Sequence, residues 1–162
     1  MKKVYFIVIG IITIFLVVIL LSKNSSASNF ENINAMTGDI EIYKSLTCGC
    51  CSVYSSYVDS KVSPKVKSID LQDIDKINQL KTQYGVPKEL ESCHTMIVGD
   101  YFIEGHIPLE AVEKLIKEHP NIAGIAMPGM PSGSPGMPGS KSGSFVIFAV
   151  NNDGTYSEFM RI

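Results

Sequence analysis

The chain has 162 residues, a formal net charge of −2 and four cysteines, and 45% of its residues are hydrophobic. Residues 1–27 contain three lysines and no acidic residue, so the rest of the chain has 11 basic and 16 acidic residues. This acidic balance, without a basic patch, argues against nucleic acid as a partner, and the length suits one small domain with a single core.

The N-terminal segment predicts export. Lys2 and Lys3 precede residues 4–21, an uncharged stretch that has the minimum length of a membrane-spanning helix. The lysines are expected to stay in the cytoplasm, so that the following domain faces the periplasm or the extracellular side. We expect residues 1–27 to be an uncleaved membrane anchor. A signal peptide cleaved at Ser25-Ser26-Ala27, which leaves a periplasmic protein, is the alternative.

Residues 28–38 are predicted to be a flexible tether, because this region is rich in Ser and Asn and has little to bury. Residues 39–162 are predicted to form one domain. Its elements follow from alternating apolar runs, helical apolar faces and Gly/Pro stop signals. In chain order we expect strand 39–44, helix 52–61, strand 65–71, helix 73–84, strands 96–98 and 101–103, helix 108–119, and strands 145–150 and 156–161.

Residues 122–143 show no periodicity and are predicted to be a long loop punctuated by Gly and Pro. Loops of this length in small domains are usually functional or disordered. Three methionines lie in this loop, within near-repeats of Met-Pro-Gly and Pro-Gly-Met: Met127, Met130 and Met137.

The predicted order is β-α-β-α-β-β-α followed by a β-hairpin, which matches a thioredoxin-like α/β fold. In such a fold the first strand ends where the first helix begins, and the loop before the third strand packs beside that junction. Here the junction is Thr47-Cys48-Gly49-Cys50-Cys51, and the loop, residues 87–95, contains Cys93-His94. The topology therefore predicts that cysteines more than forty positions apart converge.

The chemistry of this junction favours a soft metal. A helix N-terminus exposes unpaired N–H groups and a partial positive charge, which stabilise thiolates. Three thiolates within four residues repel one another, and a bound cation removes that repulsion. Sulfur ligands select copper(I), zinc or iron–sulfur clusters. The methionine thioethers favour copper over zinc, because thioether is a good copper(I) ligand in an oxidising compartment.

Three alternatives remain open at this point. Structural disulfides are natural in an exported domain with four cysteines, although cysteines this close constrain little chain entropy. Thiol–disulfide chemistry through Cys48 and Cys51 suits a Cys-x-x-Cys pair, but Cys50 is placed to trap mixed disulfides. A zinc site built from the four cysteines is the third alternative.

The histidines differ in their relation to the cysteines. His94 follows Cys93 directly and is a candidate ligand or a hydrogen-bond donor to one. His106, before the third predicted helix, is the weaker candidate and is left out of the predicted ligand set. His119 lies at a helix C-terminus, where the dipole favours a cationic side chain, and it is given no role in the site.

Five motifs in order resemble the CopG-like family of exported bacterial metal-binding proteins, over about residues 40–159. They are Tyr43 to Cys51, Gly85-Val86-Pro87, Glu91 to Thr95, Glu104 to Pro108, and the Met-Pro-Gly segments from Met127 to Met137. The resemblance implies a thioredoxin-like domain, an association with copper resistance, and copper binding by the clustered cysteines. The ligands carried over from the family are Cys48, Cys50, Cys51 and Cys93, followed by His94 and the methionines.

The sequence therefore predicts an exported protein that binds copper(I) in copper resistance or homeostasis, by sequestration, transfer or redox handling. Its expected partners are copper ions and a copper exporter or chaperone. No catalytic residue is assigned, and a change in the oxidation state of copper is the one enzymatic activity that accompanies this reading. The alternatives are a thiol–disulfide oxidoreductase and a zinc-binding protein. The predicted metal ligands are Cys48, Cys50, Cys51, Cys93, His94, Met127, Met130 and Met137.

Overall fold

The computed structural model describes residues 30–162. The predicted membrane anchor or signal peptide, residues 1–27, lies outside the described residues, as do the first two residues of the predicted tether. Within residues 30–162, no helix combines the length and the apolar character that crossing a membrane requires.

One mixed sheet of seven strands, in the order β2-β1-β3-β4-β5-β6-β7, runs through the described part of the chain. β1 is parallel to β2 and antiparallel to β3, β4 is antiparallel to β3, and β5 is parallel to β4. β6 and β7 form the predicted C-terminal hairpin. The strands are β1 (Ile40–Ser45), β2 (Val66–Leu71), β3 (His94–Val98), β4 (Tyr101–Glu104), β5 (Gly124–Ala126), β6 (Val146–Val150) and β7 (Tyr156–Arg161).

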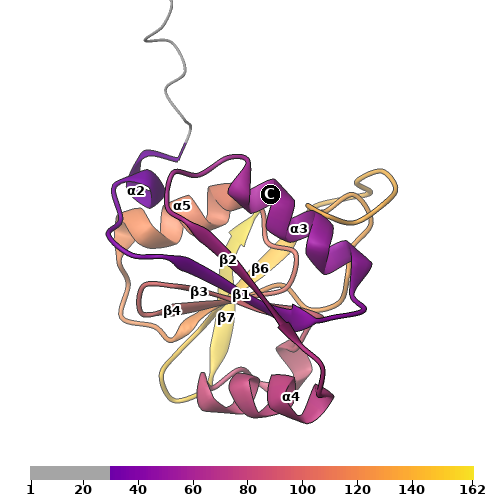
Figure 1. The fold of residues 1–162 in the computed structure, drawn as a ribbon. Coiled ribbons are helices and arrows are strands. Elements are labelled where there is room, and N and C mark those ends of the chain that lie inside the picture. Colours follow the sequence, from indigo (N-terminus) through magenta and orange to yellow (C-terminus); the bar gives the residue numbers. More distant parts are fainter. Residues whose placement is uncertain (1–29) are drawn as a thin grey trace, which may run out of the picture.

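Helices cover both faces of the sheet (Figure 1). One face carries α2 (Glu31–Asn34), α3 (Gly49–Asp59) and α5 (Leu109–Glu118), and the other carries α4 (Ile74–Gln83). A short 3₁₀ helix, Lys88–Leu90, precedes β3. The larger core cluster lies under α3 and α5, and a smaller cluster includes Val86, Leu90 and Phe102. The apolar periodicity of the sequence thus places the main core on the α3 and α5 face.

The mixed α/β fold class is confirmed, and all the predicted strands and helices occur in the predicted order, with α2 before them and β5 inserted ahead of the C-terminal hairpin. The thioredoxin-like description of this arrangement stays an interpretation. Two boundaries differ in a way that matters for the site. α3 begins at Gly49 instead of Ser52, and β3 begins at His94 instead of Met96. Cys50 and Cys51, which were predicted to precede the helix, therefore lie within α3, and His94 lies within β3.

One strand was missed inside the predicted loop 122–143. β5 pairs with β4 on one side and with β6 on the other, and all three of its residues are buried. Three residues are too few for an alternating pattern to appear in the sequence. The long loop therefore begins after β5, and we call residues 127–143 the methionine loop.

The tether prediction is wrong for the described residues before β1. Phe30 and Ile33 are buried in the main core, and α2 lies against α5. The Glu113 carboxylate of α5 accepts hydrogen bonds from the Asn32 N–H (2.8 Å), the Asn32 side-chain amide (2.6 Å) and the Ile33 N–H (3.0 Å). Two apolar side chains one turn apart and a carboxylate at the helix N-terminus suffice to dock this segment.

The register of the sheet explains how distant cysteines meet. β1 and β3 are antiparallel, and Lys44 near the end of β1 lies opposite His94 at the start of β3. The chain leaves β1 and enters the cysteine-rich turn just where the segment carrying Cys93 enters β3. The predicted convergence therefore follows from one strand pairing.

Candidate metal centre

Three cysteines lie at the start of α3. Cys48 is the N-cap residue, and Cys50 and Cys51 lie in the first helical turn. We call Cys48, Cys50 and Cys51 the triplet. No side chain caps this helix end, so its exposed N–H groups remain available to stabilise negative charge on sulfur. Cys51 is buried, whereas Cys48 and Cys50 are partly exposed, which gives the triplet an accessible edge.

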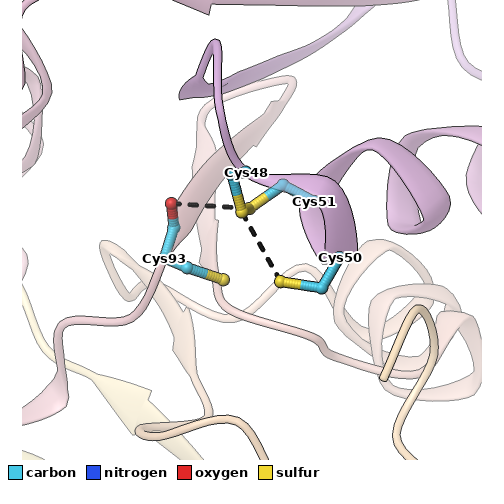
Figure 2. Close-up of side chains that lie close together, drawn as sticks. All are labelled: Cys48, Cys50, Cys51 and Cys93. Carbon is cyan, nitrogen blue, oxygen red and sulfur yellow. Dashed lines mark hydrogen bonds between the residues drawn. A yellow bond between two sulfur atoms is a disulfide. The ribbon is translucent and has the colours of Figure 1, made fainter. Parts of the chain in front are cut away.

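Cys93 joins the triplet, as the topology predicted. The four sulfur atoms of Cys48, Cys50, Cys51 and Cys93 all lie within 4.8 Å of one another. The Cys51 sulfur lies 3.7 Å from the Cys93 carbonyl oxygen, and the Cys48 and Cys50 sulfurs are 3.5 Å apart. Figure 2 shows both contacts as dashed lines. This spacing allows one ion to contact several of the sulfurs.

A disulfide joins Cys48 to Cys51, whose Cα atoms are 5.3 Å apart, and leaves Cys50 and Cys93 as free thiols. The structure therefore represents an oxidised state of the triplet. A disulfide sulfur carries no charge and is a poor metal ligand, so reduction of this bond is required before all four cysteines can act as thiolates.

Two histidines lie on the other side of Cys93. The Cys93 Sγ is 3.0 Å from His106 Nε2 and 3.4 Å from His94 Nδ1. Cys93, His94 and His106, which we call the histidine group, have ligand atoms that also lie within 4.8 Å of one another. Cys93 thus belongs to both sets of candidate ligands, and the two sets form one continuous site.

The hydrogen bond of His106 determines its tautomer. Its Nδ1 lies 2.7 Å from the Pro135 carbonyl oxygen, which can only accept, so Nδ1 carries the proton. In the neutral ring Nε2 then has a lone pair directed at the Cys93 sulfur. A carbonyl that fixes the second nitrogen is the usual arrangement for a histidine that ligates a metal.

His94 is held differently. Its ring is completely buried, packs against Tyr54 with a centroid distance of 4.4 Å, and meets His106 edge-on at 4.8 Å. Its Nε2 has no hydrogen-bond partner among the described residues. Buried polar atoms without a partner are rare, and a metal ion or a ligand is one explanation for such an atom.

Burial sets the protonation of this group at neutral pH. Desolvation, followed by the nearby Cys50, raises the pKa of Cys93 to about 11, so without metal Cys93 is a neutral thiol. Desolvation also lowers the pKa of His94 well below its usual value and lowers that of His106. A cation that binds here therefore meets two neutral imidazoles and must displace a proton from Cys93.

The methionine loop lies against both parts of the site. Its Gly129 carbonyl accepts a hydrogen bond from the Ser92 hydroxyl (2.8 Å), and its Pro135 carbonyl holds His106. Gly136 has a φ of +82°, and a Cβ there would lie 2.8 Å from the Cys50 carbonyl oxygen. Only glycine allows this approach, so the loop lies directly on the first turn of α3.

The predicted methionine ligands occupy three different environments. Met127 is buried in the main core, Met130 is 53% exposed, and Met137 is partly buried directly after Gly136. Their metal role stays a prediction. The contact of Gly136 with α3 makes Met137 the methionine whose backbone is held next to the triplet.

The sequence reasoning thus placed Cys48, Cys50, Cys51, Cys93 and His94 in the region where the structure brings them together. It left out His106, whose Nε2 lies 3.0 Å from the Cys93 sulfur. The available signal was the Glu104-Gly105-His106-Ile107-Pro108 motif, but its distance from Cys93 depends on the β3–β4 pairing. The donor set is chemically consistent: thiolates and neutral imidazoles suit copper, and imidazole with thiolate also suits zinc.

Comparisons with known proteins agree with this chemistry. A family described as "Protein of unknown function, DUF411" matches residues 90–137, which include the histidine group and most of the methionine loop but not the triplet. Two solved structures of the copper resistance protein CopG are similar. Form 1 has 30% identity and a TM-score of 0.69, and the match covers 78% of this chain and 98% of that chain. Form 2 has 30% identity, a TM-score of 0.68 and coverage of 76% and 97%. No curated protein matches the chain.

Proposed function

The chain belongs to the CopG family of copper resistance proteins, and on that premise we propose that it binds copper(I) at the triplet and the histidine group. The observation that carries the proposal is the meeting of four cysteine sulfurs within 4.8 Å at a helix N-terminus. Soft sulfur ligands in this number favour copper(I) over harder cations. The uncharged N-terminal stretch supports a location outside the cytoplasm, in the periplasm or on the extracellular side.

The residues have separate parts in this proposal. Cys50 and Cys93 are free to bind in the oxidised state, and Cys48 and Cys51 join them after reduction. His94 and His106 supply neutral nitrogen ligands that are already held in place by packing and by the Pro135 carbonyl. The partly exposed edge at Cys48 and Cys50 lets copper exchange with a donor or acceptor, such as an exporter or a chaperone.

The function that follows is sequestration or transfer of copper during copper stress. Redox handling is compatible with the same site, because the two electrons released when Cys48 and Cys51 close their disulfide are enough to reduce two copper(II) ions to copper(I). Zinc remains the competing cation, and the partly exposed sulfurs together with the methionine loop favour copper.

The decisive experiment is an anaerobic titration of the reduced protein with copper(I) against a chelator of known affinity. We expect the protein to bind copper(I) more tightly than micromolar. A parallel titration with zinc should give a weaker affinity than that for copper(I). Protein alkylated with iodoacetamide serves as the control, because it keeps the chain but loses the thiolates. Binding of copper(I) no tighter than micromolar would overturn the proposal.

A second candidate, thiol–disulfide exchange, is favoured by the Cys48–Cys51 disulfide at the start of α3. The neighbouring Cys50 sulfur, 3.5 Å from that of Cys48, weighs against it, because it is placed to attack the bridge or trap an intermediate. Reduction of insulin by the metal-free protein tests this candidate. Activity that depends on Cys48 and Cys51 supports it, and no activity in the metal-free protein rules it out.

A further inference from the structure

A buried ion pair lies behind the histidine group. Lys81, in the last turn of α4, and Glu104, at the end of β4, form a salt bridge, and their exposed fractions are 2% and 0%. The Lys81 ammonium also donates to the Thr95 hydroxyl (3.2 Å), which donates to the Glu104 carboxylate (2.6 Å). Two opposite charges are thus buried in direct contact, and one hydroxyl is hydrogen-bonded to both of them.

Stability alone does not explain this arrangement. Removing two charges from water costs more than their attraction commonly returns, and apolar replacements of a buried pair are often neutral or stabilising. The pair also touches none of the candidate ligand atoms. His94 and Thr95 are consecutive in β3, so their side chains point to opposite faces of the sheet. His94 packs on Tyr54 of α3, whereas Thr95 meets Lys81 of α4.

The contacts of Glu104 show what the pair holds. Its carboxylate accepts the backbone N–H of Ser92 (2.5 Å) and the hydroxyl of Thr95. These two residues immediately precede and follow Cys93-His94. One carboxylate therefore brackets the two-residue segment that carries both ligands, and it fixes the backbone on each side.

The residue that follows Glu104 helps to determine where His106 lies. Gly105, between Glu104 and His106, donates its N–H to the His94 carbonyl (3.0 Å). Its φ is +88°, and a Cβ there would lie 2.6 Å from the Met127 carbonyl and 2.9 Å from the Ser92 side chain. The Glu104 carboxylate thus holds the segment carrying Cys93, and its neighbour Gly105 ties the segment carrying His106 to His94. The ligand atoms of Cys93 and His106 are 3.0 Å apart.

We propose that Glu104, held by Lys81, is a positioning residue for the metal site: its carboxylate brackets Cys93 and His94 and sets their distance to His106. This inference rests on the proposed copper function, because it concerns how tightly the same site binds. Neither Lys81 nor Glu104 contacts the metal. Their effect reaches the site through the backbone of Ser92, Thr95 and Gly105.

The test uses two double variants of the full chain that differ at one position. Lys81→Met with Glu104→Gln removes both charges but keeps an amide at the same place, whose oxygen accepts from the Ser92 N–H and whose NH2 donates to the Thr95 hydroxyl oxygen. Lys81→Met with Glu104→Met removes both charges and the bracket. Copper(I) affinity is measured on each reduced protein against bicinchoninate, and thermal unfolding is recorded in parallel. The pair Lys114→Met/Glu118→Met on the outer face of α5 controls for the loss of two charges.

We expect the Gln variant to bind copper(I) within a few-fold of the parent and the Met variant to lose roughly 10- to 100-fold, the range typical of residues that orient metal ligands. Thermal midpoints should not follow the same order. Equal copper(I) affinity in the two double variants, whether high or low, contradicts the positioning role of Glu104. If neither variant folds, Thr95→Val decides: it keeps the ion pair and removes one bracketing hydrogen bond, and unchanged affinity overturns the inference.

The parent protein separates this inference from the function on which it rests. A parent that fails to bind copper(I) more tightly than micromolar contradicts the proposed function. A parent that binds tightly, with double variants that bind equally, contradicts the positioning role alone.

Discussion

The triplet and the histidine group are neighbours built in different ways. Cys48, Cys50 and Cys51 come from the N-cap and first turn of one helix, whereas Cys93, His94 and His106 are held by two strands and a distant carbonyl. The triplet is partly exposed and contains a disulfide, while both histidines are fully buried and neutral. Only Cys93 belongs to both groups.

The two groups differ in how readily their candidate ligands can change state. Two-electron reduction of the Cys48–Cys51 disulfide would raise the number of free thiols in the triplet from one to three. The histidine group has no such freedom, because its rings are packed against Tyr54 and each other. The candidate site thus combines two buried, closely packed imidazole rings with a partly exposed triplet whose cysteines are sensitive to redox state.

Replacing Cys93 should have the largest effect, since it disrupts both groups at once. We expect Cys93→Ser to lower copper(I) affinity by on the order of 100-fold or more, beyond the usual effect of an orienting residue. The matched variant Cys50→Ser removes one sulfur from the triplet only and should lose less. Chelator competition on the reduced proteins measures both. Equal losses in the two variants contradict the shared role of Cys93.

Oxidation should weaken the triplet and spare the histidine group. Protein with a closed Cys48–Cys51 bridge should show two reactive thiols, and reduced protein four. Copper(I) affinity should fall on the order of tenfold on oxidation, because two soft ligands are withdrawn. The double variant Cys48→Ser/Cys51→Ser provides the control, since its affinity should no longer respond to the redox state. A response that persists in this variant means that other thiols are responsible.

His106→Asn tests the histidine group alone. We expect roughly tenfold weaker copper(I) binding, since the variant loses the Nε2 lone pair that faces Cys93. His119→Asn is the matched control, because His119 bonds to Tyr101 and takes no part in the site, and Asn tolerates its left-handed backbone. Copper affinity that falls equally in both variants points to a general loss of stability.

The methionines allow a finer comparison over the triplet. Met137→Leu should weaken copper(I) binding by a few-fold, because the preceding Gly136 lies against the Cys50 carbonyl. Met130→Leu should leave affinity unchanged, since that side chain is largely exposed. Met127→Leu should alter thermal stability and not affinity, because Met127 belongs to the core. Titrations with copper(I) and thermal melts on the three variants distinguish these outcomes. If all three variants bind copper(I) as tightly as the parent, no methionine thioether contributes to the site.

The smallest effect on copper(I) affinity is expected from a substitution at Glu113, which is remote from both groups. Burial raises the pKa of Glu113, but hydrogen bonds from Asn32 and Ile33 outweigh burial and lower it. The stabilisation is therefore full above the unfolded pKa of about 4.3 and is lost as pH falls through the lower folded pKa. Glu113→Gln should cost about 1–2 kcal/mol at pH 7 and unfold with a weaker acid dependence. Copper affinity should stay unchanged, and denaturant unfolding across pH 3–7 measures the effect.

Local patterns in the chain predicted the order of the longer strands and helices, the apolar faces of the helices and the clustering of sulfur at the start of α3. These features depend on neighbours within a few residues, so periodicity and motif spacing carry them. The sequence also predicted that Cys93 would meet the triplet, because the order of elements implied which strand ends lie together. β5 and α2 were missed, since each is only three or four residues long and depends on partners elsewhere in the chain.

The approach of His106 to Cys93 could not be predicted from local patterns in the chain. His106 lies thirteen residues from Cys93, and the β3–β4 pairing brings their ligand atoms to 3.0 Å. Its tautomer depends on a carbonyl 29 residues further on, and the unpartnered nitrogen of His94 exists because the fold excludes water from it. Distances and burial of this kind arise from strand register and close packing, which no local pattern in the chain encodes.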